Sequence, residues 1–327
     1  MSTLITGSAG FIGYHLSKEL LERGENVYGL DNLNSYYDVK FKKFRLIQLK
    51  KYKNFKFIGA DLADSELVLK IFKKTKPKSV YHLAAQAGVR LPLSEWDKYL
   101  LNNELVFINI LRSIQSLSVK NFIYASSSSV YGNSKSNFKE KKHTPNPNNY
   151  YGITKYSNEL TARLFTNISS ISTRGLRFFS VYGPYGRPDM AYFRLFKAAL
   201  LNQEFSLNGD GLIRRDFTYI SDVINCILLL KENLDCQSSN FHDVVNVGGG
   251  KPISMRNLIE IIENLTDKRI KVKIKVNDKF DVISTNSNTK YLKSLINYVP
   301  KKDISDGMIE TYNWFLENKN LLKNTKN

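Results

Sequence analysis

A glycine-rich turn near the start of the chain is the feature that most constrains its fold. Gly7, Gly10 and Gly13 stand between a short apolar segment, residues 3–5, and an amphipathic stretch, residues 11–23, with apolar side chains at helical spacing. Such a turn lets backbone amides approach a diphosphate, which the N-terminus of the helix then stabilises. The glycine spacing alone also fits a simple tight turn, so its interpretation depends on what surrounds it.

An acidic residue follows where a dinucleotide site needs one. Asp31 ends the next apolar segment, residues 27–30; its carboxylate can accept hydrogen bonds from ribose hydroxyls and would repel a 2′-phosphate. This favours NAD over NADP, and Asn32 can bond to the same ribose. Asp61 and Leu62 end a third apolar segment, where an adenine ring is expected, although an Asp at a strand end is often only a helix cap.

The alternation of short apolar segments with helical stretches predicts an α/β fold. We expect a Rossmann-type, doubly wound parallel sheet in residues 1–180 and a smaller mixed α/β C-terminal domain in residues 181–327. Some segments within residues 216–247 are expected to return to the first domain. The predicted strands of the first domain lie at residues 3–5, 27–30, 55–58, 79–83, 121–125 and 175–179.

The charge of the chain is strongly positive, with 48 Lys and Arg residues against 30 Asp and Glu and a formal net charge of +18. Such a balance can indicate a nucleic-acid partner. Here the lysines are spread along the chain rather than gathered in a patch. We therefore expect a solvated basic surface that at most assists the capture of an anionic small molecule, and no nucleic-acid partner.

Cysteine, histidine and hydropathy patterns exclude several other classes. Two cysteines, Cys226 and Cys236, are too few for a disulfide framework in a chain of this length, and the four histidines are scattered without metal-ligand spacing. The chain opens on the glycine-rich turn rather than on a signal peptide, and its apolar runs are too short to span a membrane. We expect a cytoplasmic protein with no metal and no membrane partner.

A second pattern indicates acid–base chemistry. Tyr151 and Lys155 lie four residues apart at the start of a predicted helix, and so on one face of it. A lysine cation beside a phenol lowers the phenol pKa and prepares a base. The run Ser126–Ser129 ends the predicted strand at 121–125, at the edge where open α/β sheets place their chemistry. A Tyr-x-x-x-Lys pattern alone is common by chance.

With these motifs in place, the chain resembles the extended short-chain dehydrogenase/reductase family over nearly its whole length. Within that family it is similar to the nucleotide-sugar epimerases, and most similar to UDP-glucuronate 4-epimerases. The resemblance rests on Thr6-Gly7-x-x-Gly10-Phe11-Ile12-Gly13, Asp31-Asn32-Leu33-Asn34-x-Tyr36-Tyr37-Asp38, His82-Leu83-Ala84-Ala85-Gln86-Ala87-Gly88-Val89-Arg90, the serine run before Val130-Tyr131-Gly132, Tyr151-x-x-x-Lys155, residues 179–191 and Arg215-Asp216-Phe217-Thr218-Tyr219.

The resemblance implies a role for each of a set of residues. Ser127 would bond the reacting sugar hydroxyl, Tyr151 would be the general base, and Lys155 would hold the nicotinamide ribose. The cofactor, NAD, would be bound by Gly7, Gly10, Phe11, Ile12, Gly13, Asp31, Asn32, Asp61, Leu62, Leu83, Ala84, Gln86, Asn103, Tyr151, Lys155 and Phe178. The nucleotide-sugar substrate would be bound by Ser128, Ser180, Arg187 and Arg215, with Arg90 a weaker candidate.

Two of these arginines suit anionic parts of a substrate. By the resemblance, Arg215 would grip the diphosphate and Arg187 the carboxylate of a uronic acid, because a guanidinium fork matches both groups. Without the resemblance, Arg187 would be interpreted as a loop arginine paired with Asp189. The family also implies a homodimer.

The serine run separates the epimerase from its sister enzymes. By the resemblance, 4,6-dehydratases carry an Asp-Glu pair after the catalytic Ser or Thr, and UDP-glucuronate decarboxylases carry a Glu there. This chain has Ser128 and Ser129, which cannot act as carboxylic acids. We therefore expect C4 epimerisation of UDP-glucuronate. The alternatives are a UDP-glucose or UDP-N-acetylhexosamine epimerase, an ordinary NAD-linked dehydrogenase, and a non-catalytic NAD-binding protein; a dehydratase or decarboxylase is less favoured.

Overall fold

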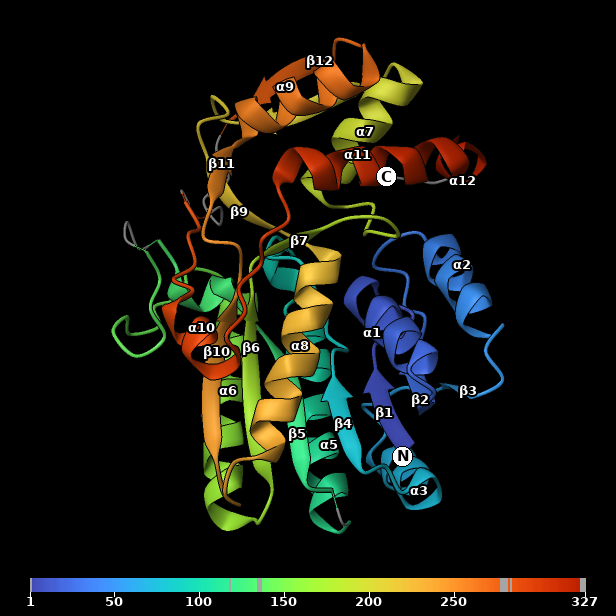
Figure 1. The fold of residues 1–327 in the computed structure, drawn as a ribbon, viewed down its shortest axis with the longest axis vertical. Helices are drawn as coiled ribbons and strands as arrows, with labels where there is room; N and C mark the ends of the chain where they lie inside the picture. The colour runs from blue at the N-terminus through green and yellow to red at the C-terminus, as the bar shows by residue number, and fades with distance from the viewer. Residues whose placement is uncertain (1, 118, 134–136, 277–281, 283, 324–327) are drawn as a thin grey trace.

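The computed structural model describes residues 2–117, 119–133, 137–276, 282 and 284–323. Seven strands form its central sheet: β1 (Ser2–Thr6), β2 (Asn26–Asp31), β3 (Phe55–Gly59), β4 (Ser79–His82), β5 (Asn121–Ser127), β6 (Ser172–Phe178) and β10 (His242–Val247). They are all paired in parallel, in the order β10-β6-β5-β4-β1-β2-β3 (Figure 1). This topology confirms the predicted doubly wound Rossmann-type sheet.

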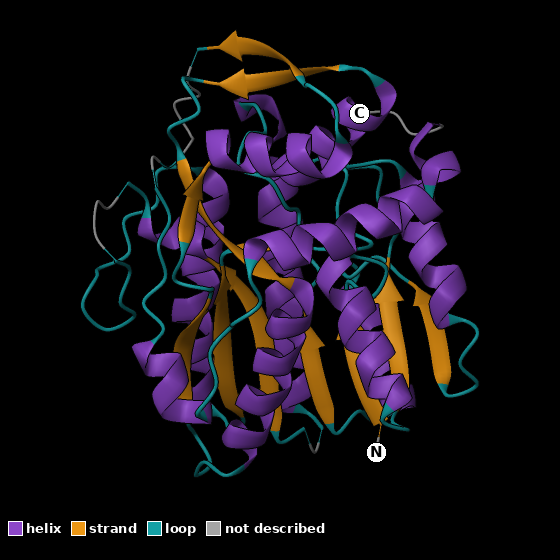
Figure 2. Cartoon of the chain, turned by 45° about the horizontal axis from the view of Figure 1, so that its top comes forward, coloured by secondary structure: helices purple, strands orange, loops and turns teal. Residues whose placement is uncertain are grey.

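Helices cover both faces of the sheet (Figures 1 and 2). One face carries α1 (Phe11–Glu22) and α8 (Ile220–Asp235). The other carries α3 (Ser65–Thr75), α5 (Val106–Gln115) and α6 (Tyr150–Ile168). Because both faces are covered, every residue of β6 is buried, as expected of a central parallel strand.

Two of these elements come from the second half of the chain. β10 pairs with β6 in register from His242 opposite Thr173 to Val247 opposite Phe178. α8 packs against α1 on the same face of the sheet. The chain therefore returns to the large sheet after building part of the layer above it.

That layer lies above the carboxyl edge of the sheet, at the top of Figure 1. β7 (Ser180–Tyr182), β9 (Arg214–Tyr219) and β11 (Pro252–Ser254) form one small sheet there, and β8 (Glu204–Asn208) pairs with β12 (Lys271–Lys275) in another. The helices near these sheets are α7 (Ala191–Leu201), α9 (Met255–Thr266), α11 (Ile304–Glu317) and α12 (Lys319–Lys323). The remaining elements are α2 (Val39–Leu49), α4 (Asp97–Tyr99), α10 (Lys290–Ile296), the 3₁₀ turns η1 (Leu93–Glu95) and η3 (Ser128–Tyr131), and the π-helical turn η2 (Leu100–Leu105).

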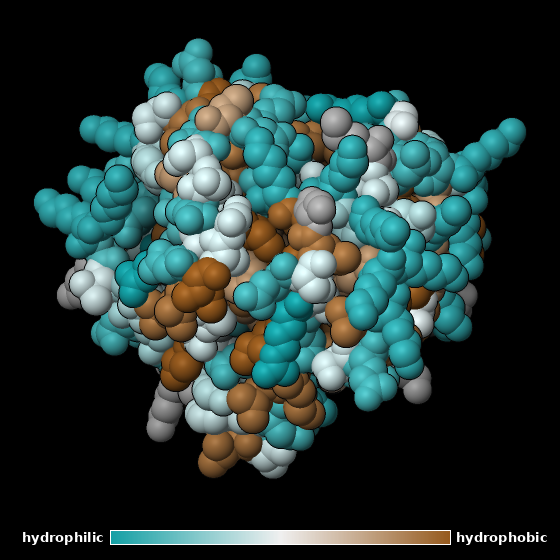
Figure 3. Space-filling view, turned by 90° about the horizontal axis from the view of Figure 1, so that it is seen from below, coloured by the Kyte–Doolittle hydropathy of each residue, from teal (hydrophilic) through white to brown (hydrophobic). Residues whose placement is uncertain are grey.

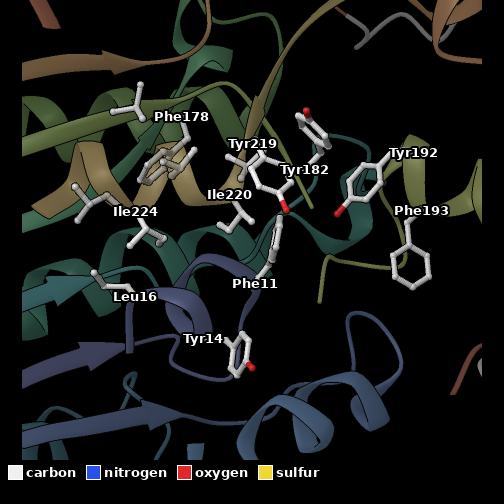
Figure 4. Close-up of a cluster of buried hydrophobic side chains, with 14 of the residues drawn as sticks. Phe11, Tyr14, Leu16, Phe178, Tyr182, Tyr192, Phe193, Tyr219, Ile220 and Ile224 are labelled. Atoms are coloured by element: carbon white, nitrogen blue, oxygen red, sulfur yellow. The ribbon is translucent and has the colours of Figure 1, made fainter. Parts of the chain in front are cut away.

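An aromatic cluster joins this layer to the sheet (Figure 4). Tyr14 of α1 packs on Tyr185 in the loop after β7, with ring centroids 4.7 Å apart. Phe193 of α7 packs on Phe315 of α11, also at 4.7 Å. Buried aromatic pairs of this kind contribute about 0.5–1.5 kcal/mol each beyond the area they bury. The layer is thus fixed over the carboxyl ends of the strands, where the cavity described below opens.

One face of the molecule exposes large apolar side chains. They lie on η2, α5 and α6. Figure 3, the view from below, shows brown, hydrophobic side chains grouped on part of the surface. The exposed residues are Leu100, Leu101, Leu105, Ile108, Ile153, Leu160, Leu164 and Ile168. Within the described ranges, no helix combines the length and the apolar character needed to cross a membrane.

Candidate active site

A cavity of about 900 Å³ opens at the carboxyl edge of the sheet, under the upper layer. This is near the upper end of the size range of small-molecule sites. It brings together most of the residues predicted from the sequence. They are Gly7, Gly10, Phe11, Ile12, Gly13, Asp31, Asn32, Asp61, Leu62, Leu83, Ala84, Ser127, Ser128, Tyr151, Lys155, Phe178, Ser180, Arg187 and Arg215, together with Arg90.

The glycine-rich turn is packed too closely for any side chain at two of its positions. Gly7 has a positive φ of 72°, and a Cβ there would lie 2.7 Å from the backbone nitrogen of Ala84. A Cβ on Gly13 would lie 2.1 Å from the carbonyl oxygen of Gly7. The turn therefore presses the start of α1 against β1 and β4, with its backbone facing the cavity.

The N-terminus of α1 is suited to an anion. Its N-cap is Gly10, which has no side chain to accept a hydrogen bond, and no acidic residue lies in the first turn. By contrast, α3 and α6 are capped by the side chains of Asp64 and Asn149. The first amide groups of α1 are thus left to a ligand, and a diphosphate fits this cradle in charge and in shape.

Asp31 lies at the end of β2, beside this turn. One carboxylate oxygen accepts from the amide of Ala9 at 3.1 Å, and the other accepts from the amide of Leu33 at 2.8 Å. Each oxygen keeps a second lone pair. The carboxylate is therefore fixed by backbone groups and can still accept hydrogen bonds from ribose hydroxyls. The residues present fit an NAD molecule.

Gln86 and Asn103 do not line the cavity. Asn103 is fully buried; its side chain accepts from the amide of Gln86 at 2.8 Å and donates to Thr154 Oγ1 at 3.0 Å. This side chain fixes the backbone after β4 against helix α6. Direct contact of Gln86 or Asn103 with the cofactor stays a prediction.

Ser127, Tyr151 and Lys155 converge from two elements. Ser127 ends β5, and its Oγ accepts from the amide of Ser129 at 3.1 Å. Tyr151 and Lys155 stand one turn apart at the start of α6, with the lysine Nζ 5.8 Å from the centroid of the phenol ring. Lys155 is buried and donates to the carbonyl of Ala125 at 3.0 Å. All three line the cavity.

The electrostatics of Tyr151 differ from the expectation. Burial raises the pKa of Tyr151, and this effect is the largest. The charge of Arg187 and a hydrogen bond with Ser127 oppose it by stabilising the phenolate. Burial also lowers the pKa of Lys155 to about 8. Burial therefore dominates the pKa of Tyr151. The charge that opposes this rise is that of Arg187, which is far from Tyr151 in the sequence, rather than that of Lys155, which was expected to lower the pKa.

Arg187 lies in the loop between β7 and α7 and forms an ion pair with Asp189. Its Nε donates to one carboxylate oxygen at 3.0 Å and its Nη2 to the other at 2.5 Å. The pair raises the pKa of Arg187 and holds the pKa of Asp189 below its usual range. The N–H groups of Nη1 are not used by Asp189. The paired and the carboxylate-binding interpretations are therefore compatible.

The ring of Tyr36 lies beside this pair. The Arg187 guanidinium carbon is 6.0 Å from the ring centroid, and a Cβ on Gly88 would lie 2.0 Å from the Tyr36 hydroxyl. Burial raises the pKa of Tyr36 to about 12, and the charge of Asp189 adds to this effect. Tyr36 and Gly88 were noted in the sequence only as marks of the family. Their packing in the cavity comes from residues about fifty positions apart in the chain.

A buried ion pair between Glu159 and Arg177 bonds to the first residue of the serine run, Ser126. Glu159 forms two hydrogen bonds with Arg177, at 2.8 and 2.6 Å, and accepts from Ser126 Oγ at 2.5 Å. The sequence analysis did not predict this ion pair. Spacing could have indicated Glu159, because Tyr151, Lys155 and Glu159 follow one another at intervals of four on one face of α6.

Arg215 enters the cavity from β9, in the upper layer. The next residue, Asp216, is fully buried and accepts from the amides of Gly249, Gly250 and Ser287 at 2.9–3.0 Å. Burial raises the pKa of Asp216, although these bonds oppose it. Asp216 thus anchors β9 to two neighbouring segments, and this fixes the strand from which Arg215 enters the cavity.

Comparison with known proteins agrees with this geometry. The model of the NAD dependent epimerase/dehydratase family matches residues 3–248, well over half of the chain. The chain belongs to the NAD dependent epimerase/dehydratase family, and it is an NAD-dependent enzyme. This confirms the resemblance found in the sequence.

Three relatives narrow the comparison. A UDP-glucuronate 4-epimerase of Thermodesulfobacterium geofontis is 37% identical over 324 residues, 99% of this chain and 98% of that protein. The crystal structure of UDP-glucuronic acid 4-epimerase from Bacillus cereus, in complex with UDP-glucuronic acid and NAD, is 31% identical, with a TM-score of 0.90 over 97% of this chain and 99% of that chain. A UDP-glucose 4-epimerase of Thermotoga maritima, with UDP-glucose, is 28% identical, with a TM-score of 0.88 over 98% of this chain and 100% of that chain.

Proposed function

We propose that the enzyme interconverts UDP-glucuronate and UDP-galacturonate by transient oxidation at C4 of the sugar. The observation that carries the proposal is the Arg187–Asp189 pair, which lines the same cavity as Tyr151 and is close enough to influence its pKa. A fixed guanidinium beside the general base suits a sugar with a carboxylate at C6. The likeness to the Thermodesulfobacterium and Bacillus cereus enzymes supports this substrate.

The glycine-rich turn, Asp31 and Asn32 would hold the diphosphate and adenosine ribose of NAD. Lys155 would bond the nicotinamide ribose, because its charged form has donors beyond the one that Ala125 accepts. When bound, NAD supplies the acceptor and donor of the hydride that leaves and returns to C4. The protein binds the two partners and fixes their orientation.

Tyr151 and Ser127 would handle the proton of the C4 hydroxyl. Tyr151, as phenolate, takes this proton, and the two groups that oppose its raised pKa, Arg187 and Ser127, make that form more accessible. Since Ser127 Oγ already accepts from the Ser129 amide, its own hydrogen is directed elsewhere, toward the phenol or the sugar oxygen. The pair supports both the oxidation and the return step.

The intermediate is a 4-keto uronic acid, a β-keto acid that can lose CO₂. Arg187 would hold the carboxylate so that the C5–carboxyl bond stays out of line with the carbonyl π system. Ser128 and Ser180, which line the same cavity, would donate to the sugar or its carboxylate. With Ser128 and Ser129 after Ser127, no carboxylic acid stands at the positions that the dehydratase and decarboxylase relatives use.

A neutral hexose is the alternative substrate, favoured by the likeness to the Thermotoga maritima UDP-glucose 4-epimerase. A panel separates the two: the purified protein is incubated with UDP-glucuronate, UDP-glucose and UDP-N-acetylglucosamine without added NAD, and products are read by NMR. We expect conversion of UDP-glucuronate at a kcat/KM at least tenfold above the others. Preference for UDP-glucose would replace the proposal, and a dependence on added NAD would favour an ordinary dehydrogenase.

We also propose a homodimer through α5 and α6. The apolar residues exposed on these helices and on η2 support it, because monomeric proteins rarely leave so many large apolar side chains exposed to water. Leu164, on α6, is 61% exposed. Light scattering should report a dimer for the native chain and a monomer for Leu164→Lys, with Ile47→Lys, on another face, as the control.

Two further assignments follow as proposals. Residues 1–180 would form the NAD-binding unit, and residues 181–327 would contribute the substrate arginines, with α8 and β10 completing the sheet of the first unit. The enzyme would act in the cytoplasm. Its two free cysteines, Cys226 buried and Cys236 exposed, support a reducing compartment. Cell fractionation with detection of the protein tests this location.

A further inference from the structure

Three consecutive backbone carbonyls precede Arg187, and side chains from two helices bind all three. His15 of α1 bonds the carbonyl of Pro184 through Nε2 at 2.9 Å. Arg45 of α2 donates from Nε to the carbonyl of Tyr185 at 2.8 Å and from Nη2 to that of Gly186 at 2.7 Å. Each bond joins a helix that follows a strand of the large sheet to the loop that carries Arg187.

The same arginine also reaches the glycine-rich turn. Its Nη1 donates to the carbonyl of Ala9 at 3.0 Å and to the hydroxyl of Tyr37 at 2.8 Å. Arg45 is 1% exposed, and the partners of its side chain among the described residues are three carbonyls and a phenol hydroxyl, with no carboxylate among them. A guanidinium is expensive to bury without an anion unless its donors are satisfied, and four of its five N–H groups are. Because Arg45 donates only to carbonyls and a phenol hydroxyl, an ion pair does not explain why this cation is buried.

The loop that it binds has a backbone that needs support. Tyr185 has a positive φ of 59°, a left-handed conformation that is unfavourable for a bulky residue. A Cβ on Gly186 would lie 1.7 Å from the hydroxyl of Tyr192. The ring of Tyr185 stacks on Phe44 of α2, with centroids 5.7 Å apart and planes 20° apart. Helix α2 therefore holds both the ring and the carbonyl of the residue in the strained conformation.

We propose that Arg45, aided by His15, is a positioning residue that ties the Arg187 loop to the glycine-rich turn, so that recognition of the acidic sugar depends on a side chain outside the cavity. Arg45 does not line the cavity and touches neither reacting group. It acts by fixing the carbonyl next to Arg187 and thereby the direction of the guanidinium. The specificity part of this inference rests on the proposed function; the loop-fixing part does not.

The hydrogen bonds of His15 and Arg45 to the carbonyls of residues 184–186 are called the clamp here. The test uses two variants that remove parts of this clamp in different ways. Arg45→Lys keeps a cation on α2 but loses the planar fork that bonds Ala9, Tyr185 and Gly186 together. His15→Phe keeps an aromatic ring among its neighbours and removes the bond to Pro184. Lys43→Met is the control, because it removes an exposed cation from the same helix. Amide hydrogen exchange of residues 183–190 reports on the loop, and calorimetry gives Kd for UDP-glucuronate and UDP-glucose.

We expect both clamp variants to exchange residues 183–190 roughly tenfold faster than the native protein and the control. Kd for UDP-glucuronate should rise about tenfold, while Kd for UDP-glucose stays within about twofold. Native exchange in both variants would overturn the inference, as would equal weakening of both ligands. If the native protein itself does not prefer UDP-glucuronate, the proposed substrate fails, and the exchange rates alone decide whether Arg45 fixes the loop.

Discussion

Removing Arg187 should delete its positive charge and also leave the negative charge of Asp189 without a partner. In the structure, Asp189 is neutralised by a bidentate bond to Arg187, and its side chain is 31% exposed. The variant Arg187→Met leaves this carboxylate without its partner, inside the cavity that is to receive the substrate carboxylate. The double variant Arg187→Met with Asp189→Asn removes both charges and most of the repulsion.

The size of the effect has two parts. A charge-assisted hydrogen bond from Arg187 to the substrate contributes about 1.5–3 kcal/mol, equivalent to roughly 10–150-fold in binding. Two carboxylates about 6 Å apart repel by about 3 kcal/mol at an effective dielectric constant of about 20. Since Asp189 is partly solvated, we halve this second part. We therefore expect Arg187→Met to lower kcat/KM for UDP-glucuronate by roughly 10³-fold, and Asp189→Asn to restore about tenfold in the double variant.

The assay follows conversion of UDP-glucuronate by coupled chromatography in the native protein, the two single variants and the double variant. Bound NAD, measured after denaturation, is the internal control, because the Arg187 side chain bonds Asp189 rather than the glycine-rich turn. NAD content should remain within about twofold of the native value. Equal loss of NAD and of uronate turnover, or a double variant no better than Arg187→Met, would refute the reasoning.

Three more changes test other parts of the account. Tyr151→Phe should keep NAD and lower turnover by roughly 10²-fold or more, as expected for a lost general base; near-native rates would reject this role. Gly13→Ala should lose most bound NAD and about 1–3 kcal/mol of unfolding free energy, because its Cβ would lie 2.1 Å from the Gly7 oxygen; Gly59→Ala, with its nearest neighbour at 3.6 Å, is the control. His82 is buried, and its pKa is lowered to about 3. The unfolded state binds a proton below about pH 6.5 and the folded state does not, so between pH 7 and 5 the free energy of unfolding should fall by about 2 kcal/mol from this group. Urea unfolding should find this loss reduced in His82→Gln; an unchanged pH dependence would contradict the assignment.

The strands and the glycine-rich turn were predictable because their signals are local. Alternating apolar segments and helices specify a parallel sheet, and the strands predicted at residues 27–30, 55–58 and 121–125 lie within β2, β3 and β5. Helix α2 was missed because its sequence is rich in lysine and weakly amphipathic. It nevertheless buries Lys42 and Arg45, whose surroundings come from the loop after β7 rather than from neighbours in the chain.

The site was predictable as a set of residues but not as an arrangement. Ser127, Tyr151 and Lys155 carry a motif, and the structure places them in one cavity. The influence of Arg187 on the phenol could not be predicted, because it depends on a loop more than thirty residues further along the chain. The π-helical turn η2, which precedes α5, is likewise not revealed by local spacing in the sequence.

The central claim is that C4 of the sugar is oxidised and then reduced by the same hydride. The most direct measurement incubates the purified protein with UDP-glucuronate deuterated at C4, without added NAD, and reads the product by NMR and mass spectrometry. The account predicts UDP-galacturonate that retains deuterium at C4. A product without the label, or a pentose formed by loss of CO₂, would contradict it.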